Sequence, residues 1–199
     1  MLVSEGAHVK AGLWERIVGR GGEVVPTLNA LLADAQWIEH EAEISMDEED
    51  EAAAWALLHA AFLAARIGDP SSIQPLLEMV DCCADVDRLH TGFPWFPARF
   101  GAGGVDAFLR FCLDPARDHY VRAGIAEGLV WAAGLYPETR PAIVAAFTSE
   151  LASMTNDEIG FTTWLMLAAA RIDDDGIRKA LRAANDRGAF DEGFFGSFE

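Results

Sequence analysis

Cysteine is scarce in this sequence, and its spacing excludes two common uses of the residue. The three cysteines, Cys82, Cys83 and Cys112, are an odd number, two of them adjacent, with no Cys-x-x-Cys pair. This pattern fits neither a disulfide framework nor a zinc site, and it suits a reducing compartment such as the cytoplasm. His40-Glu41 begins like a zinc-protease motif, but Ile44 stands where the second histidine is required. We expect no metal, no cofactor and no catalytic residue.

Basic residues are also few, which bears on the partners that the chain can bind. There are 15 Lys and Arg against 32 Asp and Glu, for a formal net charge of −17. Nucleic-acid binding depends on clustered cations, and anionic membrane surfaces attract them, so the charge argues against both partners. Long apolar runs are missing too, because Ala52–Ala65 and Ile125–Leu135 fall short of the ~20 residues of a membrane span. Since Met1–Gly6 has no signal-peptide character, we predict a soluble, cytoplasmic protein.

The sequence lacks the alternation of apolar and polar residues that marks β-strands, and it carries instead a helical repeat. Four apolar anchors, Ile67, Phe100, Leu135 and Ile172, are spaced 33, 35 and 37 residues apart. A polar or Gly/Pro-rich break follows each anchor, and an amphipathic segment follows each break. A period in the thirties with one break per unit is typical of stacked helix pairs.

The breaks divide the chain into expected helices. We predict them over His8–Gly19, Val24–Trp37, Glu51–Arg66, Ser72–Cys82, Val105–Leu113, Asp118–Leu135, Arg140–Ser153, Glu158–Ile172 and Ile177–Asn185. The whole of 1–199 is expected to be one domain: a divergent first helix pair in 1–38, an acidic loop at 39–51, and a repeat body over 52–199. Within that body, Gly92, Pro94 and Pro97 would disrupt a long helix, so residues 85–99 are predicted to form an extended elbow followed by a short helical turn.

Two segments carry a family resemblance: Trp55–Pro70 and Asp114–Leu129. They resemble the repeats of a family of uncharacterised bacterial HEAT-like proteins, some of which bear a C-terminal zinc-binding SEC-C tail that has no counterpart here. The resemblance covers roughly residues 50–199. It implies an all-α, right-handed superhelix of about five helix pairs that serves as a binding scaffold, with no catalytic residue. It also makes Asp118 and Arg122 the best matches to the stacked Asp and Arg of related repeats.

The leading functional prediction is a protein-interaction scaffold, with the elbow and the acidic loop as its contact points. The elbow would supply aromatic anchors, and the loop would steer a partner with a basic surface. The residues expected to bind the partner are Phe93, Trp95, Phe96, Asp47, Glu48, Glu49 and Asp50. The oligomeric state is left open.

A small-molecule binder or enzyme is the alternative, with its pocket on the concave face near the elbow. His90, Asp118 and Tyr120 would line that pocket. A further alternative concerns Trp55 and two later tryptophans, Trp131 and Trp164, which lie 12, 4 and 8 residues before their anchors. Offsets that differ by four place the three rings on one helical stripe, either in the core or in a shared aromatic groove.

Overall fold

The computed structural model describes residues 11–34, 48–82, 92–153 and 159–190. Within these ranges the chain is all-helical and contains no strand, which confirms the predicted all-α class. The helices are α1 Ala11–Gly19, α2 Val25–Leu32, α4 Glu48–Ile67, α5 Ile73–Cys82, α7 Trp95–Phe100, α8 Val105–Cys112, α9 His119–Leu135, α10 Arg140–Ser153, α11 Ile159–Ala169 and α12 Asp175–Asp186. None of these described helices is both long and apolar enough to cross a membrane.

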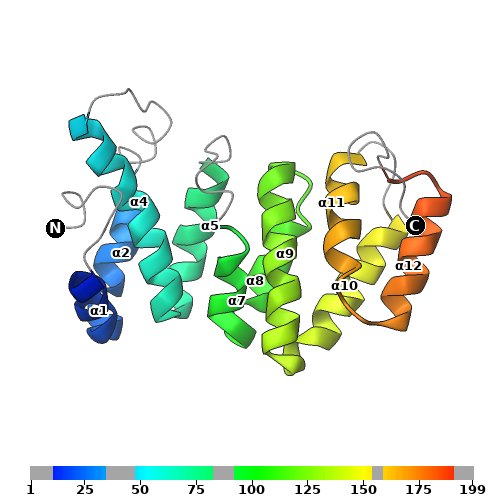
Figure 1. Cartoon of the computed structure of the whole chain (residues 1–199), viewed down its shortest axis with the longest axis horizontal. Coiled ribbons are helices and arrows are strands. Elements are labelled where there is room, and N and C mark those ends of the chain that lie inside the picture. The colour runs from blue at the N-terminus through cyan, green and yellow to red at the C-terminus, as the bar shows by residue number, and fades with distance from the viewer. Residues whose placement is uncertain (1–10, 35–47, 83–91, 154–158, 191–199) are drawn as a thin grey trace.

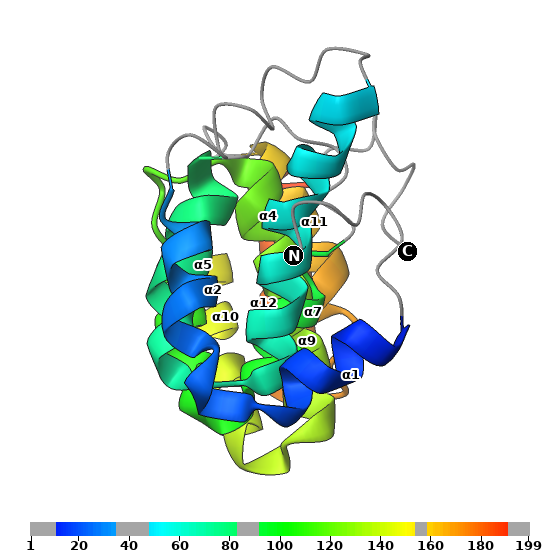
Figure 2. The same cartoon turned by 90° about the vertical axis from the view of Figure 1, so that its left-hand side faces the viewer.

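The helices form two layers that run side by side along the long axis of the molecule (Figures 1 and 2). The first layer is the row α4, α7, α9, α11, and the second layer is the row α2, α5, α8, α10, α12. Helix α1 packs against α4 on the outer side of the first layer (Figure 2). Each helix chiefly contacts its neighbours along the row and in the other layer, so the array grows in one direction.

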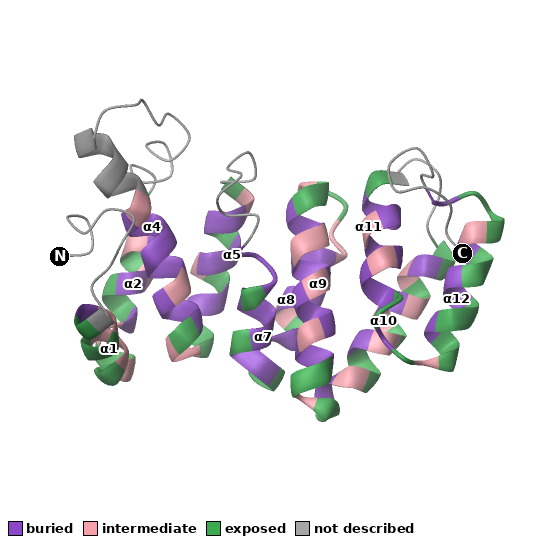
Figure 3. Ribbon diagram, in the orientation of Figure 1, coloured by how far each residue is buried: buried purple, intermediate pink, exposed green. Residues whose placement is uncertain are grey.

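The core lies between the two layers and extends into the first layer (Figure 3). Helix α4 buries the small residues Ala60, Ala61 and Ala64, which let neighbouring helices approach closely. The second layer contributes large side chains such as Phe108 and Phe147, both fully buried. Burying an aromatic side chain of this kind stabilises the fold by about 1.5–3 kcal/mol.

Short polar breaks end one helix and begin the next. Gly68 has a φ of +73°, a left-handed conformation that terminates α4 at little cost for glycine. Asp69 accepts hydrogen bonds from the hydroxyl of Ser71 and from its backbone N–H, the latter at 2.9 Å. Both bonds lower the pKa of the Asp69 carboxyl. Asp118 and Asp174 cap α9 and α12 in the same way, each accepting from the N–H groups two and three residues on. These caps explain why the helices begin where they do.

Helices α7 and α9 cross at unusually short range. A Cβ on Gly128 would stand 2.5 Å from the carbonyl oxygen of Pro94 and 2.7 Å from the Pro97 ring. One turn earlier, a Cβ on Gly124 would stand 2.8 Å from the Cβ of Phe93. The two glycines of α9 therefore form a flat surface on which the start of α7 lies.

The acidic loop and the elbow differ in part from the prediction. Helix α4 begins at Glu48, so Glu48, Glu49 and Asp50 belong to its first turn and not to a loop. The physical reason is that carboxylates favour the positive end of a helix, which extends α4 toward them. In the elbow, the short helical turn is present as α7, whereas residues 85–91 and Asp47 lie outside the described residues.

Candidate functional site

Of the three aromatic residues predicted in the elbow, only Trp95 is available at the surface. Trp95 is 45% exposed, whereas Phe93 and Phe96 are 0% exposed, so the prediction that they bind a partner is wrong. Phe93 is buried against Gly124 of α9, and the Phe96 ring packs against Phe62 of α4, with ring centroids 5.8 Å apart. The turn before α7 and the helix itself lie against α4 and α9, so Phe93 and Phe96 point inward and Trp95 does not.

The residues of the predicted pocket are His90, Asp118 and Tyr120. His90 lies outside the described residues. Asp118 caps α9, and the ring of Tyr120, which is 44% exposed, lies tilted against the His119 ring with centroids 4.1 Å apart. Neither Asp118 nor Tyr120 lines either of the two hollows described next.

The Trp95 side chain borders a hollow where α1, α4 and α7 meet. The volume of this hollow is about 250 Å³. We call it the Trp95 hollow, and it is lined by Trp14, Phe62, Ala65, Arg66, Trp95 and Arg99. Trp14 comes from α1, so the helix that stands outside the first layer closes one side of it.

Aromatic contacts hold the lining of the Trp95 hollow in place. The Trp95 ring meets Trp131 of α9 edge to face, with centroids 5.5 Å apart. Trp14 meets His59 of α4 edge to face at 6.3 Å, and Trp55 stacks on the same His59 at 6.1 Å. Trp55 and Trp131 are half-buried, as is Trp164, so the predicted tryptophan stripe lies at the edge of the core. Rigid aromatic side chains of this kind lose little entropy when a ligand covers them.

The Trp95 hollow is positively charged. Arg66 and Arg99 are exposed, and among the described residues neither makes an ion pair or a hydrogen bond. The Arg99 guanidinium lies 5.6 Å from the centre of the Trp95 ring, a cation–π contact that leaves its N–H donors available. None of the described residues that line the hollow carries a carboxylate. The chain has about twice as many acidic as basic residues. A hollow whose described lining holds two arginines and no acidic residue is therefore a distinct feature.

Sequence reasoning missed these arginines, although the repeat contained a signal for them. Arg66 and Arg99 each stand one residue before an apolar anchor, and so does Arg171. Equivalent positions in stacked units lie side by side, which brings Arg66 and Arg99 to one hollow. Arg171 differs from them because its guanidinium pairs with Glu127 at 2.6 Å.

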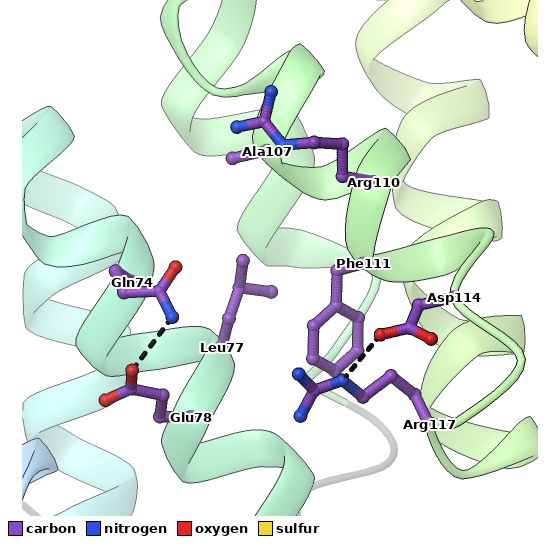
Figure 4. A pocket seen from close by; sticks show the side chains of 8 residues that line it. All are labelled: Gln74, Leu77, Glu78, Ala107, Arg110, Phe111, Asp114 and Arg117. Atoms are coloured by element: carbon purple, nitrogen blue, oxygen red, sulfur yellow. Dashed lines mark hydrogen bonds and ion pairs between the residues drawn. The ribbon is translucent and has the colours of Figure 1, made fainter.

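A second hollow lies between α5 and α8 (Figure 4). Its volume is about 170 Å³. It is lined by Gln74, Leu77, Glu78, Ala107, Arg110, Phe111, Asp114 and Arg117.

The polar groups of this second hollow largely pair with one another. Arg117 lies over the Phe111 ring and forms ion pairs with Asp81 and Asp114. The pKa of the Asp114 carboxyl is lowered by the N–H of Ala116 and then by Arg117. Because its lining carries two acidic and two basic residues, this hollow has no charge of one sign to offer a partner and is a weaker candidate than the Trp95 hollow.

Comparisons with known proteins add no family to this picture. The chain matches no protein-family model, no curated protein and no solved structure. Among the described residues, no group of three or more His, Cys, Asp or Glu side chains is placed to hold a metal ion.

Proposed function

We propose that this chain is a protein-interaction scaffold whose partner docks over the Trp95 hollow. The proposal includes the architecture expected from the sequence, a HEAT-like right-handed superhelix of about five helix pairs. Its support is the two-layer row of helices, which offers long exposed faces and requires no catalytic centre. The cytoplasm, the location expected from the cysteine pattern, remains part of the proposal.

The observation that carries the proposal is the exposure of Trp95 beside Arg66 and Arg99. Tryptophan and arginine are the residues most enriched among those that dominate binding energy at protein interfaces. A half-exposed tryptophan leaves a large apolar surface in water, and covering that surface is favourable at roughly 25 cal/mol per Å². Trp14 and Phe62 border the same hollow, so a partner would meet three aromatic side chains together.

A small-molecule binder is the second candidate, because the Trp95 hollow includes part of the elbow where such a pocket was expected. Its volume of about 250 Å³ argues for a partner side chain over a whole ligand. Pockets for small molecules usually enclose about 300–1,000 Å³. A thermal-shift screen of metabolites would favour this alternative if one compound stabilised the wild type and not a Trp95→Ala variant.

The scaffold is tested by affinity capture from the lysate of the source organism, followed by purification of any captured protein. The purified partner would be titrated against the wild type, a Trp95→Ala variant and a Leu135→Ala control. Leu135 is 65% exposed at the end of α9, does not line the hollow, and so matches Trp95 as an exposed apolar residue.

We expect Trp95→Ala to weaken the purified complex by about 2 kcal/mol, or roughly thirtyfold in Kd, and Leu135→Ala to leave it unchanged. Circular dichroism and thermal melting would establish that both variants remain folded. A partner that binds wild type and folded Trp95→Ala equally well would contradict docking at this hollow.

A further inference from the structure

We infer that the segment docking in the Trp95 hollow is acidic, with one large apolar side chain set between carboxylates. This inference rests on the proposed function and adds the chemical class of the partner. It follows from three properties of the hollow: two arginines that no described residue pairs, a described lining without acidic residues, and a size suited to a single side chain.

The first property is that two cations have no counter-ion among the residues that the structure describes. Three described arginines are neutralised, because Arg117, Arg171 and Arg178 each form an ion pair with one or more carboxylates. Arg66 and Arg99 form no ion pair with any described residue, and in the hollow they lie beside each other. Guanidinium groups bind carboxylates with two parallel hydrogen bonds, so an incoming Asp or Glu is their natural ligand.

The second property excludes cationic ligands. Trp14, Phe62 and Trp95 would suit a methylammonium group if charge were ignored, because such groups bind among aromatic rings. The described lining holds no carboxylate and places two guanidiniums beside the rings, so a cation would be repelled. Nucleic acids also stack on aromatic rings beside arginines, but a polyphosphate extends beyond the hollow over a chain of net charge −17, whereas a short acidic segment meets only the two local arginines.

The third property is size. An open hollow of about 250 Å³ lined by aromatic and alanine side chains is below the usual range for whole small molecules. One Leu, Phe or Trp side chain of a partner segment can enter it and leave the flanking residues at the rim. The rim is where Arg66 and Arg99 are exposed, so acidic residues on either side of the anchor would meet them.

A peptide selection tests the inference directly. A displayed library of random short peptides would be selected on the full-length chain, in parallel with a Trp95→Ala variant whose fold has been verified. We expect the wild type to enrich peptides in which Asp or Glu flanks an aromatic or leucine residue, and Trp95→Ala to enrich none of them.

The best peptide would then be titrated, as a fluorescent probe, against variants of the two arginines. We expect the double variant Arg66→Gln/Arg99→Gln to weaken binding about tenfold or more. Arg182→Gln is the matched control, because Arg182 is exposed on α12, makes no ion pair with described residues and is far from the hollow. We expect this control substitution to change the Kd of the peptide by less than about twofold. Raising salt from about 50 to about 300 mM should weaken wild-type binding several-fold and the double variant less.

The outcomes separate this inference from the proposed function. Peptides that require Trp95 but are basic or uncharged, or whose Kd is unchanged by the arginine double variant, would overturn the acidic class and keep the scaffold. Tighter binding of a single-stranded oligonucleotide than of any peptide would overturn the acidic class as well. Enriched peptides that bind Trp95→Ala as well as wild type would overturn both proposals.

Discussion

The crossing of α7 and α9 allows a sharp test of the packing, through the substitution Gly128→Ala. The added methyl would lie 2.5 Å from a backbone oxygen of Pro94 and 2.7 Å from the Pro97 ring, neither of which is a flexible side-chain end. The helices would have to separate. Overpacking of this kind costs about 1–3 kcal/mol, whereas replacing a mid-helix glycine by alanine returns up to about 1 kcal/mol of helix propensity. We expect a net destabilisation of about 1–2 kcal/mol.

The same helix supplies a matched control in Gly134→Ala. Gly134 is exposed near the end of α9, and a Cβ there would have no other atom within 4 Å. Without a steric penalty, helix propensity predicts that this variant is as stable as the wild type or gains up to about 1 kcal/mol. The two substitutions are chemically identical, so the difference between them isolates the α7–α9 contact.

Urea unfolding, followed by far-UV circular dichroism and tryptophan fluorescence, measures both variants. The midpoint of Gly128→Ala should fall below that of the wild type, and the midpoint of Gly134→Ala should not. Equal midpoints for the two variants, or a rise for Gly128→Ala, would refute the close approach of these helices.

Three further outcomes follow from buried or capping groups. Arg122 is 2% exposed, donates a hydrogen bond from Nε to the carbonyl of Cys112 at 2.8 Å, and lies with its guanidinium 3.6 Å from the centre of the Phe161 ring. Arg122→Ala should therefore lower the free energy of unfolding, measured with urea, by about 3 kcal/mol or more. Burial raises the pKa of the Cys112 thiol to about 12. In a Cys82→Ser/Cys83→Ser variant, Cys112 should therefore react with a thiol reagent at pH 8 only after the protein unfolds. Rapid reaction of the folded variant would contradict this. Asp174→Ala removes the cap of α12 and should lower stability by about 1 kcal/mol, and no loss would mean that the cap is dispensable.

Most helices could be predicted from the sequence because their ends carry local chemistry. The predicted helix over Arg140–Ser153 agrees with α10 at both ends, and the one over Ser72–Cys82 differs from α5 by one residue. In both cases a turn with proline or capping residues comes just before the helix, and these signals act within a few residues. The start of α4 at Glu48 was missed because a run of acids is compatible with either an exposed loop or a first helical turn.

The candidate site was less predictable, since it depends on how the helices pack. Adjacent aromatic residues in the elbow gave no means of telling exposed Trp95 from buried Phe93 and Phe96; the decisive contacts come from α4 and α9. Arg66 and Arg99 are 33 residues apart in sequence, and only the stacking of neighbouring units brings them together. Local sequence patterns therefore predicted the individual helices, whereas the candidate site depends on contacts between helices that are far apart in the sequence.

The one-directional growth of the array also bears on how the chain folds. Its main helix contacts join elements that are close in sequence, so few long loops have to close before native packing begins. Chains dominated by such local contacts fold quickly. The Trp95 hollow and the Trp131 ring that supports it come entirely from α1, α4, α7 and α9. During synthesis this hollow can assemble before α10, α11 and α12 have left the ribosome.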